Sequence, residues 1–388
     1  MSLISRADRG LVANWWFTVD RLLLTALLML MVIGAMLSMA ASPPVAQRLD
    51  VDAFYFFRRH VIFLVPAIIL LIGASFMTPQ WARRVALVMF IGGLAMMALT
   101  LVIGPEVKGA RRWLEIGPFS IQPSEFVKPA FVILSAWFLS ESARKRSALG
   151  YLLATGMLAT VAGLLVLQPD YGQTILITAV WGVMLFLTGL SWFWIAGIGV
   201  LAGAGGVFAY MTGDHFASRI DRFMNRDAGD TFQVDRAVDA FAHGGLYGVG
   251  PGSGTVKGII PDAHSDFVFS VAGEEFGFIV CLGILLLFAF IVVRGLKHSL
   301  HAQDPFCTLA TAGLVSIFGF QSFINMGVNV SLLPAKGMTL PLVSYGGSSL
   351  LAMGLGMGLM VALARRTPMG HMPNQGSVPV GMTALGRT

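Results

Sequence analysis

The sequence IVCLGILLLFAFIVV, residues 279–293, contains no charged residue and follows directly on PDAHSDFVFSVAGEEFGF, residues 261–278. A helix that crosses a bilayer needs about 20 mainly apolar residues, so the apolar run and its flank predict a transmembrane span. The preceding stretch contains the carboxyl groups of Asp262, Asp266, Glu274 and Glu275, and one histidine, His264. The sequence therefore predicts a cluster of ionisable groups at one mouth of a membrane span.

The composition of the whole chain has the same character. Of its 388 residues, 56% are hydrophobic and only 12% are charged, whereas soluble domains contain about 25% charged residues. The net charge of +6 arises from small basic clusters between apolar runs, which is typical of membrane-protein loops, so nucleic acid is not expected as a partner. Cys281 and Cys307 lie in or beside apolar runs, so no disulfide framework is expected.

The apolar runs predict an all-α fold, a polytopic integral membrane protein with about ten transmembrane helices. The runs cover residues 21–41, 61–78, 86–104, 123–140, 149–167, 173–190, 192–211, 273–293, 308–331 and 347–364. Residues 1–20 are expected to form an N-terminal segment, and residues 21–366 the transmembrane domain. The tail, residues 367–388, is rich in Pro, Gly and Ser and is expected to be disordered.

The basic residues of the short loops predict the orientation. If the N-terminus lies in the cytoplasm, most Lys and Arg residues of the short loops also fall on the cytoplasmic side, as is usual for membrane proteins. Both termini are therefore expected in the cytoplasm. Residues 212–272 then form a large outer loop between the seventh and eighth spans. Its stretch TFQVDRAVDAFAHGGLYGVGPGSG, residues 231–254, has apolar positions at helical spacing, and a connection of this length is usually functional or disordered. We expect an ordered loop.

Three further outer stretches contain candidate site residues. In KGARRWLEIGPFSIQPSEFVKPAF, residues 108–131, Glu125 and Lys128 are three apart and hence neighbours on one helix face. They form either a structural ion pair or part of a cavity wall. In LQPDYGQT, residues 167–174, Asp170 is expected to cap the following helix. In NMGVNVSLLPAKGMTLPLVSYGGSSLL, residues 325–351, Pro and Gly interrupt an apolar run, which predicts a folded-in loop beside a site.

In the opening stretch, Asp266 is the candidate general base. Asp262 and His264 lie close enough in sequence to tune its pKa or to bind substrate. A lone histidine with scattered acids does not have the spacing of a metal site. Glu274 and Glu275 are expected to cap or pack the start of the eighth span. GVGPGSG, residues 248–254, lacks the GK[ST] of a phosphate loop and is interpreted as a cluster of turns.

Together these motifs resemble, in order and position, those of the SEDS family (shape, elongation, division and sporulation proteins), from about residue 20 to residue 366. GVNVSLLPAKGMTLPLVSYGGSS is more similar to the cell-division branch than to the elongation branch. The resemblance implies a peptidoglycan glycosyltransferase that polymerises lipid II at the outer face of the bacterial cytoplasmic membrane, at the division septum. Lipid II is a disaccharide-pentapeptide linked through pyrophosphate to a polyprenyl chain. The resemblance also implies a class B penicillin-binding transpeptidase and other division-machinery membrane proteins as partners.

The resemblance places the family's essential aspartate at Asp266 and its paired glutamate and lysine at Glu125 and Lys128. A carboxylate can take the proton of an attacking sugar hydroxyl. Asp266 could instead hold a divalent cation, magnesium or manganese, and the sequence leaves this open. Cations stabilise the charge that develops on a leaving pyrophosphate. The other expected substrate-binding residues are Arg111, Arg112, Gln122, Ser124, Lys257, His264, Lys336 and Ser344.

Two other functions use the same kind of chain. A transporter that flips lipid II would have many spans, with polar groups distributed across the bilayer and often inverted repeats. Here the ionisable groups gather at the outer side, and no repeat is detected. A non-catalytic scaffold of the division machinery is the second alternative.

Overall fold

Most of the chain is described by a computed structural model: residues 10–189 except 108 and 118, scattered positions between 193 and 211, and residues 232–334 and 337–365. The described elements are α1 (Leu11–Thr18), α2 (Arg21–Arg48), α3 (Tyr55–Ser75), α4 (Pro79–Ile103), β1 (Leu114–Ile116), β2 (Phe119–Ile121), α5 (Pro123–Lys145), α6 (Leu149–Leu167), α7 (Tyr171–Leu187), α10 (Phe232–Gly244), the 3-10 turn η2 (Val256–Gly258), α11 (Val268–His301), α12 (Pro305–Asn329) and α13 (Gly347–Leu363).

The helices confirm the predicted membrane fold. Among the described residues, seven helices are long and apolar enough to cross a membrane: α2, α3, α4, α5, α6, α11 and α12. The apolar helices α7 and α13 are shorter. Each of these helices coincides with a predicted run. Most of the remaining run, 192–211, lies outside the described residues, as do residues 212–231 and the tail from 366.

Several helices extend beyond the predicted runs. α4 begins at Pro79 and not near residue 86, because Thr78 accepts a hydrogen bond from Trp81 N at 3.4 Å and proline suits the first helical turn. α11 begins at Val268 and ends at His301, well outside the predicted 273–293. Charged helix ends project past the apolar core, so hydropathy alone predicts these helices too short. The short helix α1 and the hairpin were not predicted.

The centre of the bundle is formed by α5 and α12, which are buried along most of their apolar windows, whereas α6 and α11 are mostly exposed. Small residues allow close packing between neighbours. A Cβ added at Gly354 or Gly358 of α13 would lie 2.7 Å or 2.4 Å from backbone oxygens of Ala67 and Leu71 on α3. At these two positions, glycine allows the backbones of α13 and α3 to come into close contact.

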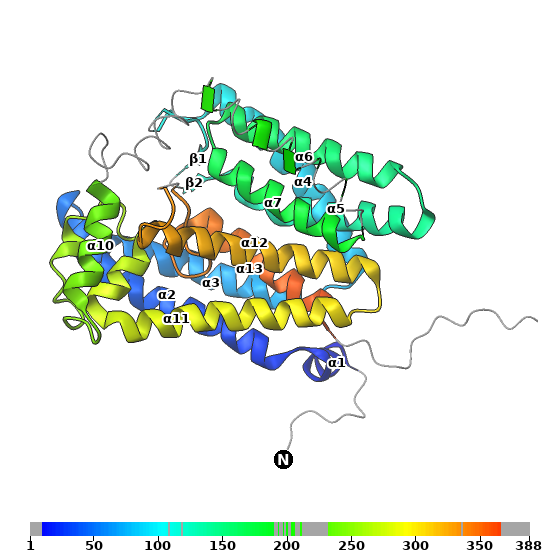
Figure 1. The fold of residues 1–388 in the computed structure, drawn as a ribbon. Coiled ribbons are helices and arrows are strands. Elements are labelled where there is room, and N and C mark those ends of the chain that lie inside the picture. The colour runs from blue at the N-terminus through cyan, green and yellow to red at the C-terminus, as the bar shows by residue number, and fades with distance from the viewer. Residues whose placement is uncertain are drawn as a thin grey trace, which may run out of the picture.

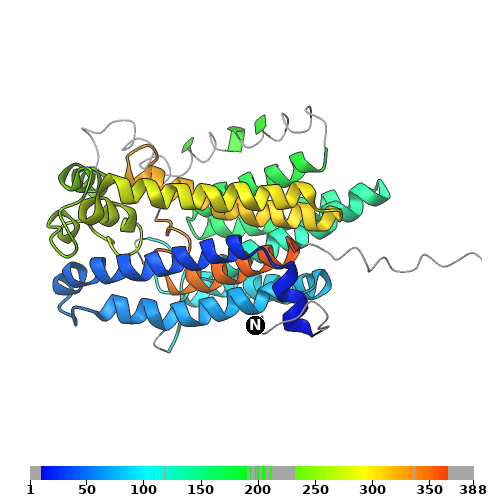
Figure 2. The ribbon, with the colours of Figure 1, turned by 90° about the horizontal axis from the view of Figure 1, so that it is seen from below.

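The helices run side by side along one direction, and their ends differ (Figure 1). The hairpin, α10 and the segment between α12 and α13 gather at one end, here called the loop end. The opposite end carries α1 and the turn between α5 and α6. Seen from below, α2 and α3 lie next to each other, and α11 lies along α12 (Figure 2). The antiparallel hairpin pairs Leu114 with Ile121 and Glu115 with Ser120.

A break in α11 holds the connection from α10. Gly277 has φ 80° and ψ 178°, a conformation that favours glycine. The break leaves backbone groups for the connection: Val249 N donates to Glu274 O at 3.0 Å, and Phe278 N donates to Gly245 O at 2.9 Å. A Cβ at Gly277 would lie 2.4 Å from Gly248 N. The predicted order of this stretch is confirmed over 232–254, the described part of it.

Candidate active site

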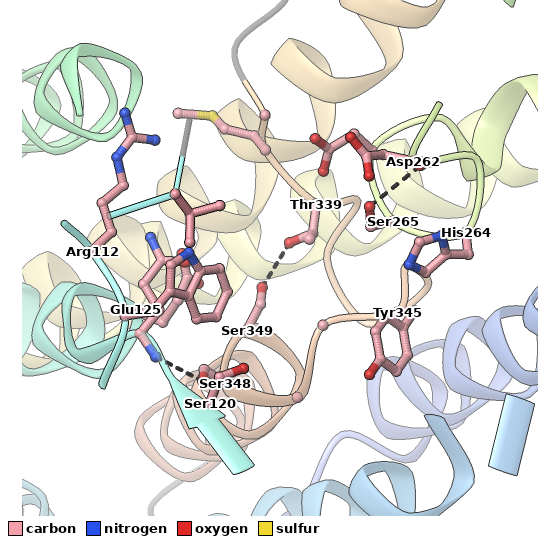
Figure 3. A pocket seen from close by; sticks show the side chains of 18 of the residues that line it. Arg112, Ser120, Glu125, Asp262, His264, Ser265, Thr339, Tyr345, Ser348 and Ser349 are labelled. Atoms are coloured by element: carbon pink, nitrogen blue, oxygen red, sulfur yellow. Dashed lines mark hydrogen bonds between the residues drawn. The ribbon is translucent and has the colours of Figure 1, made fainter. Parts of the chain in front are cut away.

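A cavity of about 370 Å³ opens at the loop end of the bundle. Its walls come from α3, the hairpin with the residues before it, the starts of α5 and α7, the turn at 262–266 and the segment 337–349. In Figure 3, Arg112 and Glu125 lie on one side, and Asp262, His264 and Tyr345 lie on the other. The cavity therefore brings together residues from five distant parts of the sequence.

Asp266 lines this cavity and is half-buried. Its backbone N–H donates to Asp262 O at 3.0 Å, and its backbone carbonyl accepts from the side-chain amides of Asn325 at 2.9 Å and Asn329 at 3.0 Å. The carboxylate faces the segment 337–339, because a Cβ built on Gly337 would lie 3.5 Å from Asp266 Oδ2. The backbone of the candidate base is thus fastened from two directions.

Two side-chain amides on α12, those of Asn325 and Asn329, hold this carbonyl, and a third amide, Gln321, precedes them on the same helix and bonds to Lys128 and Thr339. They recur at i, i+4 and i+8, hence on one helix face. Asn325 Nδ2 also donates to Met338 O at 2.6 Å, and Asn329 Oδ1 accepts from Ser270 N at 3.1 Å. Sequence reasoning missed all three. Their spacing within an apolar helix was the available signal, since polar groups at membrane depth are costly unless partnered.

The predicted pair of Glu125 and Lys128 is confirmed as a buried ion pair. Lys128 Nζ lies 2.9 Å from Glu125 Oε1 and donates to Gln321 Oε1 at 2.9 Å. Gln173 Nε2 donates to Glu125 Oε1 at 2.8 Å. Glu125 and Gln173 line the cavity, whereas Lys128 does not. The pair is therefore both a structural ion pair and part of the cavity wall. Glu125 lines the cavity, and Lys128 lies behind it.

Arg112 brings positive charge to the cavity wall. Its Nε donates to Gln168 O at 3.1 Å, its guanidinium also donates to Pro169 O, and it lies 3.7 Å from Asp170. Burial raises the pKa of Asp170, and the charge of Arg112 opposes that shift. Asp170 accepts from Gln173 N at 3.4 Å, so the expected helix cap is confirmed. Arg112 thus fixes the turn that positions Gln173.

Sequence reasoning missed a second cation in the cavity, Arg59 of α3, which donates to Tyr55 Oη at 3.1 Å. His264 is buried between Phe56, with ring centroids 4.2 Å apart, and Tyr345, at 5.3 Å. Burial lowers the pKa of His264 to about 4, while the charge of Asp262 acts in the opposite direction. At neutral pH His264 is therefore an uncharged wall of the cavity.

The remaining predicted residues divide into those that reach the cavity and those that do not. Gln122 lines it, and its backbone N–H donates to Ser348 Oγ at 3.0 Å. Ser124 is buried but does not line the cavity, and Ser344 Oγ accepts from Leu340 N at 2.8 Å within a turn. Arg111 pairs with Glu106 at 3.5 Å near the surface. Lys336 lies outside the described residues.

Lys257 lies elsewhere, in a buried ion pair with Glu275. Its Nζ also donates to Ala40 O at 2.9 Å. Pro44 cannot supply the usual i+4 N–H to that carbonyl, so the lysine completes the hydrogen bonding of α2. The structure does not bring Lys257 into the cavity with Asp266.

Glu274 and Glu275 do not cap the start of α11, as one interpretation expected. The helix begins at Val268, so both acids lie in its interior, just before the Gly277 break. Glu274 accepts from Val256 N and Lys257 N, both at 2.7 Å. The packing interpretation is confirmed, and the two carboxylates hold the connection between α10 and the site.

Among the described residues, no group of three or more His, Cys, Asp or Glu side chains is arranged to hold a metal ion. Asp262 and Asp266 both line the cavity, and one or two carboxylates are usual for magnesium, with water and substrate phosphate oxygens as its remaining ligands. The described side chains therefore do not form a complete divalent-cation site by themselves.

Comparison with known proteins places the chain in a family. A family model described as "Cell cycle protein", FtsW/RodA/SpoVE, matches residues 20–368. A probable peptidoglycan glycosyltransferase FtsW of Caulobacter vibrioides is 42% identical over 365 residues, covering 94% of each chain. A probable FtsW of Escherichia coli is 33% identical, covering 90% of this chain and 86% of that protein.

Solved structures show the same fold. One, described as the "structural coordination of polymerization and crosslinking by a peptidoglycan synthase complex", superposes with a TM-score of 0.75 and 26% identity, covering 90% of this chain and 98% of the other. The rod shape determining protein RodA of Thermus thermophilus superposes with a TM-score of 0.66 and 27% identity, covering 90% and 97%. The chain, a multi-pass membrane protein, therefore belongs to the FtsW/RodA/SpoVE family of cell cycle proteins, the SEDS family that its motifs resemble.

Proposed function

We propose that the chain is a peptidoglycan glycosyltransferase of the cell-division type, which polymerises lipid II and releases polyprenyl pyrophosphate. The names of its curated relatives support the activity. The observation that carries the proposal is the position of Asp266. Its carboxylate lines a cavity at the end of a membrane bundle, together with two arginines and several hydrogen-bonding side chains.

In the proposed mechanism Asp266 acts as the general base. The carboxylate takes the proton of an acceptor sugar hydroxyl as that oxygen attacks the anomeric carbon of the donor sugar. The new glycosidic C–O bond forms as the bond to the pyrophosphate oxygen breaks, and the pyrophosphate leaves with the electron pair. The two hydrogen bonds from Asn325 and Asn329 hold the backbone of Asp266 in place during this transfer.

The charge of the leaving group is stabilised by guanidinium groups of the cavity wall. Arg112 and Arg59 both line the cavity, and preorganised cations are most effective where negative charge develops. Arg112 is held by backbone carbonyls, so its position does not depend on the substrate. The two arginines thus take the role that the sequence suggested for Lys257, which instead pairs with Glu275.

The proposed setting is the bacterial cytoplasmic membrane at the septum, with both termini in the cytoplasm and the loop end outside. Membrane lipids surround the bundle, and the polyprenyl chain of lipid II lies in the bilayer while its sugars enter the cavity. A cognate class B penicillin-binding transpeptidase is the proposed partner, with other division-machinery membrane proteins. The similar peptidoglycan synthase complex, whose description includes crosslinking, supports this partner.

The test is a glycan-polymerisation assay with purified protein and lipid II, with and without the transpeptidase and a chelator. The wild-type protein is expected to form glycan strands, and Asp266→Asn is expected to bind substrate and remain folded without forming them. Strand formation by Asp266→Asn would contradict the role of the carboxylate. Translocation of lipid II in vesicles without polymerisation would favour a flippase, and no turnover with any partner would favour a scaffold.

A further inference from the structure

Among the residues that the structure describes, two side-chain oxygens of the cavity wall have no hydrogen-bond donor. Glu125 Oε2 and Gln173 Oε1 are both buried, and neither accepts a hydrogen bond from any residue that the structure describes. Both side chains line the cavity that contains Asp266. A buried acceptor without a donor costs free energy, so these oxygens indicate that donors arrive from the cavity.

The surrounding network fixes both acceptors. Glu125 Oε1 already accepts from Lys128 Nζ at 2.9 Å and from Gln173 Nε2 at 2.8 Å. Because the amide nitrogen of Gln173 donates to Glu125, the other end of the amide is its oxygen. The orientation of Gln173 therefore follows from this hydrogen bond. The wall presents acceptors and no competing donor at these two atoms.

The network also extends toward the opposite wall. Lys128 Nζ donates to Gln321 Oε1 at 2.9 Å, and Gln321 Nε2 donates to Thr339 O at 3.1 Å. Thr339 lines the cavity two residues after Gly337, against which the Asp266 carboxylate lies. The acceptors are thus part of one polar framework with the segment beside the candidate base.

We propose that Glu125 Oε2 and Gln173 Oε1 form a subsite for the sugar of the substrate and accept hydrogen bonds from its hydroxyl or acetamido N–H groups. This inference rests on the proposed function and specifies which part of the substrate each wall contacts. The acceptor subsite binds the carbohydrate, whereas the arginines bind the pyrophosphate. A site built to receive hydrogen bonds discriminates strongly against a ligand that lacks the donors.

The test measures binding and not turnover. The background is Asp266→Asn, and the probes are lipid II and polyprenyl pyrophosphate, which lacks the sugars. Gln173→Met keeps the length of the side chain but removes the amide. Glu125→Gln keeps the shape and replaces one acceptor with a donor. The control is Gln168→Met, which removes a buried amide that bonds to Met97 O and Thr100 Oγ1 and does not line the cavity.

Gln173→Met and Glu125→Gln are each expected to weaken the binding of lipid II by roughly tenfold or more and to leave the binding of polyprenyl pyrophosphate unchanged. Gln168→Met is expected to lower the thermal midpoint without this discrimination. Equal losses for both probes would mean a structural role, and no loss would mean that water satisfies the acceptors; either result overturns the proposal. Failure of the proposed function is separate, since it would show as no polymer from the wild-type protein despite sugar-dependent binding.

Discussion

The side-chain amide of Asn325 donates to the backbone carbonyl of Asp266 at 2.9 Å and to that of Met338 at 2.6 Å. One nitrogen therefore joins the turn that carries the candidate base to the segment on the adjacent wall. The contact is to the backbone carbonyl of Asp266. It fixes the position of the Asp266 backbone and does not use a carboxylate oxygen. Asn325 is a positioning residue in this arrangement.

Replacing Asn325 with leucine should reduce activity more than its effect on folding explains. The change leaves the Met338 carbonyl without this donor and the Asp266 carbonyl with the amide of Asn329 alone. The lost donor to Met338 is expected to lower the free energy of unfolding by about 1–3 kcal/mol. Polymerisation should fall about tenfold in kcat, because the base loses one of the two side-chain amides that fix its backbone and its link to the segment at Met338. Rates at saturating lipid II and the thermal midpoint measure the two effects.

The matched control is Ser322→Ala on the same helix, which removes a hydroxyl bonded to Phe318 O within α12. It should leave kcat near that of the wild type. An Asn325→Leu protein with normal kcat would show that Asp266 is positioned without this amide.

Gly337→Ala should impair the reaction selectively. Gly337 has φ 60°, and the added Cβ would lie 3.5 Å from Asp266 Oδ2. A left-handed conformation costs an L-residue roughly 1–2 kcal/mol. Gly245→Ala pays the same cost at φ 57° with no atom within 4 Å of the new Cβ. Both variants should show similar thermal midpoints, and only Gly337→Ala should lower kcat by a few-fold, because its methyl group lies in van der Waals contact with the carboxylate of Asp266 and desolvates it. Equal activities would show that a methyl group beside this carboxylate does not disturb the reaction.

Lys257→Met should destabilise the protein strongly, because it leaves the buried carboxylate of Glu275 without its partner. Removing one member of a buried ion pair costs about 3–5 kcal/mol. The double variant Lys257→Met/Glu275→Gln should recover part of that loss, since no unpaired charge remains. Thermal unfolding in detergent gives the coupling. If Lys257→Met is as stable as the wild type but does not turn over lipid II, this prediction is wrong and Lys257 acts in the reaction.

His264 should make stability depend on pH. Burial lowers its folded-state pKa to about 4 from the usual 6.5, so the native state favours the neutral ring. The free energy of unfolding that depends on neutral His264 is fully present above pH 6.5. It is lost as the pH falls from 6.5 to about 4, because in this range the unfolded chain binds a proton at His264 and the native protein does not. The total is on the order of 3 kcal/mol.

The measurement is the thermal midpoint between pH 7 and pH 4 for the wild type and His264→Gln. The variant should lose the part of the slope that His264 causes. His301→Gln, at an exposed position on the last turn of α11, is the control and should keep the wild-type slope. An unchanged slope in His264→Gln would contradict the neutral buried ring.

Apolar runs predicted the helices well because burial in lipid depends on local composition, as in α6, whose bounds coincide with the predicted run 149–167. The pair of Glu125 and Lys128 was also predictable, since three residues along a helix set their neighbourhood. The Asp170 cap follows a local rule of the same kind. Each of these features depends on residues that are only a few positions apart, so the local sequence is enough to predict it.

The contacts that sequence reasoning missed are separated by long stretches of chain. Lys257 meets Glu275 and Ala40 only because the α10 connection folds onto the Gly277 break. Arg59 enters the cavity because α3 extends beyond its apolar core. The three-residue strands of the hairpin are too short to show a periodic pattern. Hydropathy reports none of these, since each depends on how separate elements pack.

The amides of α12 set a requirement on chain length. Gln321, Asn325 and Asn329 share one face because successive residues are rotated by about 100°. One residue inserted or deleted between Gln321 and Asn325 would turn the amides on one side of the change away from their carbonyls. Insertions and deletions in related sequences should therefore occur in turns such as the one between α5 and α6, and not in this part of α12.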